Sequence, residues 1–372
     1  RGLSARDLAA RAIHFPENNF ELAQARRRFI YEELLLLVLA WAIKRRQTRS
    51  VRKGFTYEIK RNLLTPFRER LGFNFTAAQA RAINEIFADM RAPTPMARLL
   101  EGDVGSGKTV VALSAMLLAA ENGGQSVFAA PTEILAEQHF LTFDKFLKGT
   151  GVRFALLTGR LKAAEKKKIS EDLAAGRIDI LIGTHAVISG GVKFKNLRLV
   201  VADEQHRFGV RQRAALRAKG NKADMLIMTA TPIPRTLFLA LYGDLDLSVI
   251  KEMPPGRRPV KTTEATEDIA FSAAADEVAR GRQVYIVYPV IEETQVSDMK
   301  SIKTGFERLK LFLRGRRVDM LHGRMPGELK KRVMEDFAAG RTDVLVATQV
   351  IEVGIDVANA ALMVINNAER FG

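Results

Sequence analysis

The stretch GDVGSGKT, residues 102–109, decides the fold. It matches the pattern G-x-x-x-x-G-K-[ST], follows a short apolar stretch and opens the helix-like run VVALSAMLLAA. Such a loop can wrap a phosphate chain with its backbone N–H groups, and the helix that follows adds a favourable dipole. The residues expected to bind the phosphates are Gly102, Gly105, Ser106, Gly107, Lys108 and Thr109. A glycine-rich turn that binds no nucleotide is the alternative, and the flanking patterns argue against it.

Catalysis at such a loop needs a cation, a metal and a carboxylate from a second strand. Lys108 would reach the β and γ phosphates, and the hydroxyl of Thr109 can ligate Mg²⁺. The stretch LRLVVADEQH, residues 197–206, supplies two carboxylates after an apolar strand. Asp203 would hold Mg²⁺, and Glu204 would orient or deprotonate the attacking water. An Asp-Glu pair after a strand is usually a solvated turn, but its pairing with a phosphate loop favours a site that hydrolyses ATP.

The composition favours a polyanionic partner such as nucleic acid. Among 372 residues, 58 Lys and Arg stand against 42 Asp and Glu, which gives a formal charge of +16. The chain has no cysteine, which excludes disulfides and is compatible with a reducing cytoplasm, and its five histidines show no metal-ligand spacing. The longest apolar run, LLLLVLAWAI at 34–43, is about half as long as a membrane-spanning helix. We therefore expect a buried helix there and no membrane partner.

The order of apolar runs divides the chain into four parts. Residues 17–48 read as one long helix within a basic helical connector, residues 1–66. In residues 67–250, short β-branched or apolar runs alternate with helical stretches, which indicates a parallel sheet covered by helices. The proline-rich segment KEMPPGRRPVK, 251–261, reads as a linker. The alternation then resumes, so residues 262–372 are predicted to form a second α/β lobe.

The two predicted lobes share an internal repeat. AAGRIDILIGT at 174–184 and AAGRTDVLVAT at 338–348 agree at seven of eleven positions, and each precedes an apolar strand that ends in RFG. Aligned back from RFG, the Asp-Glu pair of the first lobe stands opposite Asn366 and Asn367. Neutral asparagines cannot neutralise Mg²⁺ or act as a base. The sequence therefore predicts one ATP site, built on the first lobe.

Together these motifs resemble those of superfamily 2 helicases, and they are closest to the RecG family of bacterial ATP-dependent DNA helicases, which act on branched DNA in recombination and repair. The matching stretches are GDVGSGKT, APTEILAEQH, DEQHRFGVRQR, TATPIPRT, LHGRM and ATQVIEVGIDV. Upstream, IHFPE and RRRFIYEELLLLVLA resemble the segment that links a wedge domain to the motor. The resemblance implies two tandem RecA-like P-loop lobes that close on ATP and reopen on hydrolysis. A monomer would then move along DNA as its grip alternates between lobes.

The resemblance also implies roles for single residues. It places Phe73 and Gln79 against adenine, with Gln79 bidentate, and Gly354 and Asp356 near the nucleotide from the second lobe. The residues that would face the DNA backbone, without reading sequence, are Pro131, Thr132, Thr158, Gly159, Thr184, His185, His322, Arg324 and Thr348. Those expected to couple hydrolysis to movement are Gln205, His206, Arg207, Thr229 and Thr231. From the residues alone, the two threonine hydroxyls could sense the γ-phosphate or bond the Asp-Glu turn.

Three alternatives stay open at this stage. The transcription-repair coupling factor, a double-strand DNA translocase, shares TATPIPRT, but its other motifs are closer to DVGFGKT and DEEQRFG. An RNA helicase of the Asp-Glu-Ala-Asp type fits less well because Gln205 and His206 stand where Ala and Asp would. Helicases of this family carry a QLRGRVGR-like arginine motif after the last residue of this sequence and a wedge domain before its first. We therefore expect a chain cut at both ends, which binds Mg-ATP, hydrolyses it poorly and acts alone as a nucleotide-dependent DNA-binding module.

Overall fold

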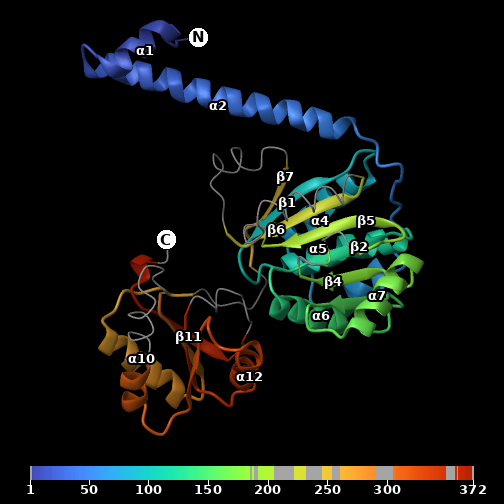
Figure 1. Ribbon diagram of the computed structural model, residues 1–372, viewed down its shortest axis with the longest axis vertical. Helices are drawn as coiled ribbons and strands as arrows, with labels where there is room; N and C mark the ends of the chain where they lie inside the picture. Colours follow the sequence, from blue (N-terminus) through green and yellow to red (C-terminus); the bar gives the residue numbers. More distant parts are fainter. Residues whose placement is uncertain are drawn as a thin grey trace. The chain divides into compact units, whose positions relative to one another are not determined.

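The computed structural model of the protein contains two compact units, Arg1–Arg257 and Arg258–Gly372 (Figure 1). The structure describes residues 2–184, 187, 192–204, 222–231, 245–253, 260–289, 305–348, 357 and 359–370. The division between the units falls within the proline-rich segment 251–261. Each unit contains a parallel sheet with helices packed on it, which confirms the predicted α/β class.

The first unit begins with two helices, α1 (Arg6–His14) and α2 (Asn19–Ser50). α1 folds back along the start of α2, where Ala9, Ala12 and Ala25 form a small buried cluster (Figure 1). Small side chains at these positions let the two helix backbones approach each other closely. The single long helix predicted in the connector is therefore present.

The apolar run of α2 at residues 34–43 is exposed, which corrects the expectation of a buried helix. Leu34 is 49% exposed, Leu36 62% and Ile43 60%. The run places apolar side chains on every side of the helix, whereas packing along one side can bury only a stripe. Within the described part of the chain, no helix is both long and apolar enough to cross a membrane.

A seven-stranded parallel sheet forms the centre of the first unit, in the order β3-β4-β2-β5-β6-β1-β7. Its strands are β1 (Ala97–Gly102), β2 (Gln125–Ala129), β3 (Phe154–Leu157), β4 (Ile180–Gly183), β5 (Leu197–Asp203), β6 (Asp224–Thr229) and β7 (Asp246–Ile250). The helices around it are α3 (Leu64–Arg70), α4 (Ala77–Arg91), α5 (Lys108–Glu121), α6 (Glu133–Leu147) and α7 (Ala163–Ala175). Because the strands are parallel, the residues that follow them meet at one edge of the sheet.

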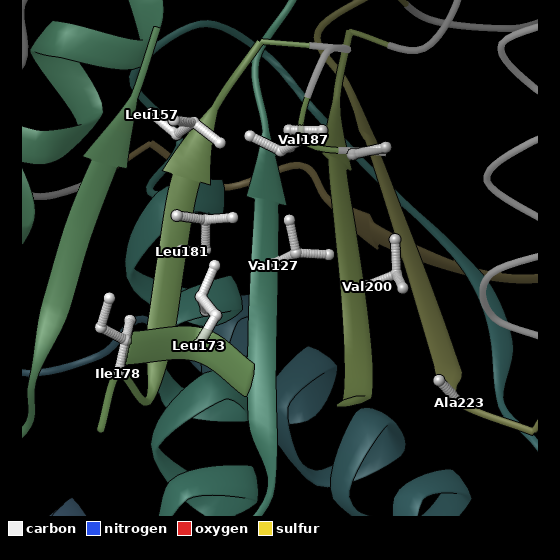
Figure 2. Packing of buried hydrophobic residues seen from close by; sticks show 10 residues of the cluster. Val127, Leu157, Leu173, Ile178, Leu181, Val187, Val200 and Ala223 are labelled. Atoms are coloured by element: carbon white, nitrogen blue, oxygen red, sulfur yellow. The ribbon is translucent and has the colours of Figure 1, made fainter. Parts of the chain in front are cut away.

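Aliphatic side chains from neighbouring strands fill the core beside this sheet (Figure 2). Val127, Leu181 and Val200 lie side by side on β2, β4 and β5, and Leu173 of α7 packs with them. Helix α5 is buried along most of its length because it is apolar on every side. Its first turn, which carries the end of the phosphate loop, is therefore held firmly against the sheet.

The second unit repeats the topology of half of the first. Its elements are α10 (Glu267–Ala279), β8 (Gln283–Val287), β9 (Val318–Leu321), α12 (Gly327–Ala338), β10 (Val344–Ala347), β11 (Ala360–Ile365) and the 3-10 helix η4 (Ala368–Arg370), with residues 305–312 also helical. Its parallel strands follow the order β11-β8-β10-β9. This order corresponds to β5-β2-β4-β3 in the first unit, so the described strands of the second lobe match one half of the first sheet.

The repeat extends to individual side-chain contacts. In the first unit, Arg153 Nη2 donates to the carbonyl of Gly176 at 2.9 Å and to Asp179 at 2.6 Å. In the second, Arg317 Nη2 donates to the carbonyl of Gly340 at 2.9 Å and to Asp343 at 2.7 Å. Two copies of one lobe, as the sequence repeat predicts, explain why the same bonds recur.

A buried glutamine closes the turn after the repeated helix in both units. Gln125 Nε2 donates to the carbonyls of Leu173 and Ile178 at 2.9 and 2.7 Å. Gln283 Nε2 donates to the carbonyl of Thr342 at 2.8 Å in the corresponding position. Both glutamines stand at the first residue of the matching strands, β2 and β8, so the helix-turn-strand unit is fastened in the same way twice.

A buried ion pair fastens the segment between α2 and the first sheet. Lys53 Nζ lies 3.1 Å from both carboxylate oxygens of Asp224, the first residue of β6, and neither side chain is accessible to solvent. The N–H of Met96 also donates to Asp224 at 2.6 Å. Burial raises the pKa of Asp224 to about 6 and lowers the pKa of Lys53, because a low-dielectric interior disfavours both charged forms.

Candidate nucleotide site

The phosphate loop joins the end of β1 to the start of α5. Gly105 and Gly107 have φ values of 78° and 89°, which side chains rarely adopt. A Cβ atom at Gly107 would lie 2.4 Å from Gln79 Nε2, and one at Gly102 would lie 2.6 Å from Ser106 Oγ. These glycines are therefore required by the shape of the loop, as the sequence pattern predicts.

Lys108 is held at the phosphate loop by carbonyl groups. Its Nζ donates to the carbonyl oxygens of Gly102 at 2.6 Å and Asp103 at 3.1 Å. Burial lowers the pKa of Lys108, while the charges of Asp203 and Glu204 act in the opposite direction. The ammonium group and the two carboxylates therefore interact within one site, although about 95 residues separate them in the sequence.

The two predicted catalytic carboxylates lie at the end of β5, two strands from the phosphate loop. Asp203 is the last residue of β5 and pairs with Met228 on β6, and β6 in turn pairs with β1. Glu204 follows in the left-handed region, with φ 48°, and its Oε1 accepts a hydrogen bond from the N–H of Ala230 at 3.0 Å. The parallel sheet thus brings Asp203 and Glu204 to the same edge as Lys108.

Thr229, the last residue of β6, is linked to Thr231, and the backbone between them is linked to Glu204. The hydroxyls of Thr229 and Thr231 lie 2.9 Å apart, and the N–H of Thr231 donates to Thr229 Oγ1 at 3.2 Å. The N–H of Ala230, between the two threonines, donates to Glu204 Oε1 at 3.0 Å. Because of this hydrogen bond, a movement of the turn would also move the Glu204 carboxylate.

The donor set fits a magnesium ion. The hydroxyl of Thr109, in the first turn of α5, and the carboxylate of Asp203 are both oxygen ligands, which Mg²⁺ prefers. Within the described residues there is no group of three His, Cys, Asp or Glu that could hold a metal. Mg²⁺ commonly takes one or two protein carboxylates and completes its shell with water and nucleotide phosphates.

Gln79 braces the phosphate loop in this structure. It is 1% exposed, its Nε2 donates to the carbonyl of Ser106 at 2.8 Å, and its Oε1 accepts the N–H of Thr76 at 3.0 Å. Both ends of the amide are therefore occupied. The expected bidentate contact with adenine would need Gln79 to release these partners, whereas Phe73 is 43% exposed and accessible for stacking on a base.

The residues expected to face DNA in the first lobe follow β2, β3 and β4. Thr132 caps α6 by accepting the N–H of Leu135 at 3.3 Å, and Pro131 precedes it. Thr158 and Thr184 are largely buried at the ends of β3 and β4. Because these strands are parallel, the four residues lie along the same edge of the sheet as the phosphate loop.

Gly159, which was also expected to face DNA, is engaged by a residue that the sequence analysis did not select. Its N–H donates to Glu133 Oε1 at 2.6 Å, and the same carboxylate lies 3.1 Å from the guanidinium of Arg160. Glu133 is the first residue of α6. In this structure its carboxylate therefore occupies the N–H of Gly159, a residue that was predicted to face DNA.

In the second lobe, the expected DNA-facing residues occupy equivalent places. His322 and Arg324 follow β9, and Thr348 follows β10, where its N–H donates to the carbonyl of Leu321 at 3.2 Å. The predicted residues that lie outside the described part of the chain are His185, Gln205, His206, Arg207, Gly354 and Asp356.

One histidine outside the predicted set contacts Asp203, the predicted metal ligand. His139 of α6 has its Nε2 2.9 Å from Asp203 Oδ2. The only sequence signal was its place in the motif-like stretch APTEILAEQH, since contacts between distant residues leave no local periodicity.

Comparisons with known proteins agree with this geometry. Residues 76–238 match the family model described as DEAD/DEAH box helicase, and residues 265–370 match the helicase conserved C-terminal domain. The ATP-dependent DNA helicase RecG of Synechocystis sp. is 45% identical over 97% of this chain and 44% of its own length. RecG of Thermotoga maritima is 49% identical over 97% of this chain and 46% of its own length. The chain spans about half the length of the curated relatives it matches.

Solved structures give the same result. A structure of RecG bound to a three-way DNA junction matches with a TM-score of 0.84 and 45% identity, and covers 100% of this chain and 49% of that one. The S. cerevisiae helicase Dbp5, solved with RNA and ADP BeF3, matches with a TM-score of 0.59 at 18% identity, over 81% of this chain and 77% of that one. The second likeness shows the fold alone. With both helicase domains present and this degree of identity throughout, the chain belongs to the RecG family.

Proposed function

We propose that this protein is an ATP-dependent DNA helicase and double-strand DNA translocase that acts on branched DNA in recombination and repair. The observation that supports this most strongly is the meeting of Lys108, Asp203 and Glu204 at one edge of a sheet, in a chain about 45% identical to RecG proteins. The solved relative with 45% identity is bound to a three-way DNA junction. A formal charge of +16 suits a DNA partner.

In the proposed mechanism, the first lobe binds Mg-ATP. Gly102, Gly105, Ser106 and Gly107 offer backbone groups to the phosphates, and Lys108 exchanges its carbonyl partners for phosphate oxygens. Thr109 and Asp203 would hold Mg²⁺, which supplies charge neutralisation at the phosphates when bound. Phe73 would stack on the adenine, and Gln79 would contact its edge.

Hydrolysis would depend on Glu204 orienting the attacking water. The carboxylate keeps one oxygen on the N–H of Ala230, so the turn that carries Thr229 and Thr231 fixes its direction. We propose that this turn, with Gln205, His206 and Arg207, reports the state of the nucleotide to the rest of the lobe. In the second lobe, Gly354 and Asp356 would contribute to the nucleotide site.

DNA would be held through its phosphates without sequence selection. Hydroxyl and backbone donors suit phosphate oxygens and carry no information about base identity. The proposed contacts are Pro131, Thr132, Thr158, Gly159, Thr184 and His185 in the first lobe, and His322, Arg324 and Thr348 in the second. We also propose that the protein works as a monomer in the bacterial cytoplasm, since the curated relatives are bacterial.

Single-turnover hydrolysis of radiolabelled ATP tests the proposal, because it detects slow as well as fast chemistry. Three-way junction DNA should accelerate hydrolysis more than linear duplex DNA or RNA of the same length. Lys108→Ala should abolish the acceleration, whereas the matched surface change Lys331→Ala should preserve it. Equal stimulation by linear duplex would favour a general double-strand translocase, and stronger stimulation by RNA would contradict the proposal.

A further inference from the structure

His139 links the helix that begins at the proposed DNA contacts to the carboxylate of the proposed metal site. Its Nε2 lies 2.9 Å from Asp203 Oδ2, with the two side chains only 13% and 11% exposed. The imidazole also packs against the ring of Phe128, at a centroid distance of 4.4 Å and an angle of 54°. Phe128 is fully buried on β2, so the imidazole is fixed between a rigid ring and a carboxylate.

The chemistry of the pair determines which atom carries the proton. An ionised carboxylate can only accept hydrogen bonds, so an Asp203 that binds Mg²⁺ requires the proton on Nε2 of His139. The bond engages Oδ2 and leaves Oδ1 for the metal or one of its waters. Partners of this kind orient a ligand and raise the affinity of the metal site.

The position of His139 along α6 connects its bond with Asp203 to the start of the same helix. The helix is capped by Thr132, a proposed DNA contact, and its first residue, Glu133, accepts hydrogen bonds from the loop after β3. His139 follows about two turns later, on the same rigid helix, roughly 10 Å from the cap. A shift of α6 when DNA binds at its start would therefore move the donor that holds Asp203.

We infer that His139 is a positioning residue that couples DNA contacts at the start of α6 to the magnesium carboxylate Asp203. This inference rests on the proposed function, because it takes Asp203 as a metal ligand. A histidine that only completes the core would affect stability and leave the magnesium requirement unchanged. The two roles therefore differ in a measurable property.

The test compares His139→Phe, which keeps a ring beside Phe128 but has no donor, with His139→Gln, whose amide can still donate to Asp203. The magnesium concentration that half-saturates binding of a fluorescent ATP analogue is measured with and without three-way junction DNA. Thermal melting of each variant reports its folding. Thr142→Val, on the same helix, serves as the control, because Thr142 donates only within the helix, to the carbonyl of Gln138.

The expected result is a half-saturating magnesium concentration about 10- to 100-fold higher in His139→Phe, and close to wild type in His139→Gln and Thr142→Val. Junction DNA should lower this concentration in the wild type and have no such effect in His139→Phe. A folded His139→Phe whose magnesium requirement stays within twofold of wild type would overturn the inference. If His139→Phe melts at a much lower temperature, the magnesium titration is repeated below its melting transition, where the variant is folded, and the same twofold limit decides.

The variant Asp203→Asn separates this inference from the proposed function. A raised magnesium requirement in Asp203→Asn with none in His139→Phe refutes the coupling role of His139 alone. No change in Asp203→Asn refutes the assignment of Asp203 as a metal ligand, and with it both the proposed site and the inference.

Discussion

Replacing Lys53 by methionine would leave the Asp224 carboxylate buried without its counter-ion. Lys53 Nζ lies 3.1 Å from both oxygens of Asp224, and neither side chain is accessible to solvent. The N–H of Met96 would remain as a donor to the carboxylate. Removing one partner of a buried ion pair typically costs about 3–5 kcal/mol, because the other charge stays buried and uncompensated.

The pH dependence gives the prediction its sharpest form. The pKa of Asp224 is already raised to about 6 by burial, and loss of Lys53 would raise it further. An acid can have a higher pKa in the folded state than in the unfolded state. It then contributes fully to the stability of the fold below its unfolded pKa, and this contribution is lost as the pH rises through its folded pKa. Consider a variant whose Asp224 stays protonated in the folded state between pH 5 and 7. Its free energy of unfolding falls by about 2.7 kcal/mol over this range, and that of the wild type falls by about half as much. The deficit of Lys53→Met should therefore be about 1–1.5 kcal/mol smaller at pH 5 than at pH 7.

Urea unfolding followed by circular dichroism at both pH values measures this effect. Arg308→Met is the control, because Arg308 and Glu267 form an exposed pair at 2.8 Å in the second unit and its loss should cost about 0–1 kcal/mol. The double variant Lys53→Met/Asp224→Asn should recover most of the lost stability, since it leaves no buried charge and its amide oxygen remains an acceptor for the N–H of Met96. A deficit below about 1 kcal/mol at pH 7, or one that does not change with pH, would refute the reasoning.

Three further changes probe the site itself. Lys108→Ala should weaken binding of a fluorescent ATP analogue at least about tenfold, as measured by titration. The variant loses a cationic partner of the phosphates that is worth about 1.4 kcal/mol or more. Gly107→Ala should destabilise the protein by about 1–3 kcal/mol, measured by urea unfolding, because φ is 89° and the new Cβ would lie 2.4 Å from Gln79 Nε2. Glu133→Gln should tighten junction DNA binding about fivefold at low salt, as measured by fluorescence anisotropy. The reason is that the Glu133 carboxylate, which competes with DNA phosphates for the N–H of Gly159 and for Arg160, loses its charge, worth about 1 kcal/mol.

The sequence predicted most of the strands because each central strand is a short apolar run. β4 and β5 read as strands for this reason, whereas their order in the sheet depends on pairing between distant segments. β7 (Asp246–Ile250) has no such run, because its polar and apolar residues are mixed, and its pairing with β1 is not visible locally. The burial of α2 was wrong for a related reason, since an apolar run does not show what packs against it.

In the candidate site, too, the sequence predicted contiguous motifs and missed contacts between residues that lie far apart in the chain. The phosphate loop is contiguous, so its pattern could be recognised directly. Gln79 was predicted to contact adenine, yet in this structure it bonds Ser106, which lies 27 positions away. His139 reaches Asp203 across 64 positions. Such contacts depend on how α4 and α6 pack on the sheet, which a single sequence does not determine.

The backbone after the matching strands, β5 and β11, gives a physical reason for the predicted single ATP site. Glu204 has φ 48° and Asn367 has φ 51°, so the two lobes keep the same left-handed residue at the same place. Asparagine adopts this region readily, whereas glutamate there costs of order 1–3 kcal/mol. The second lobe has the residue that suits the backbone and carries no charge. The first lobe keeps a strained carboxylate, fixed by the N–H of Ala230. Strain of this kind persists where function needs the group, and the proposed role of Glu204 in hydrolysis would supply that need.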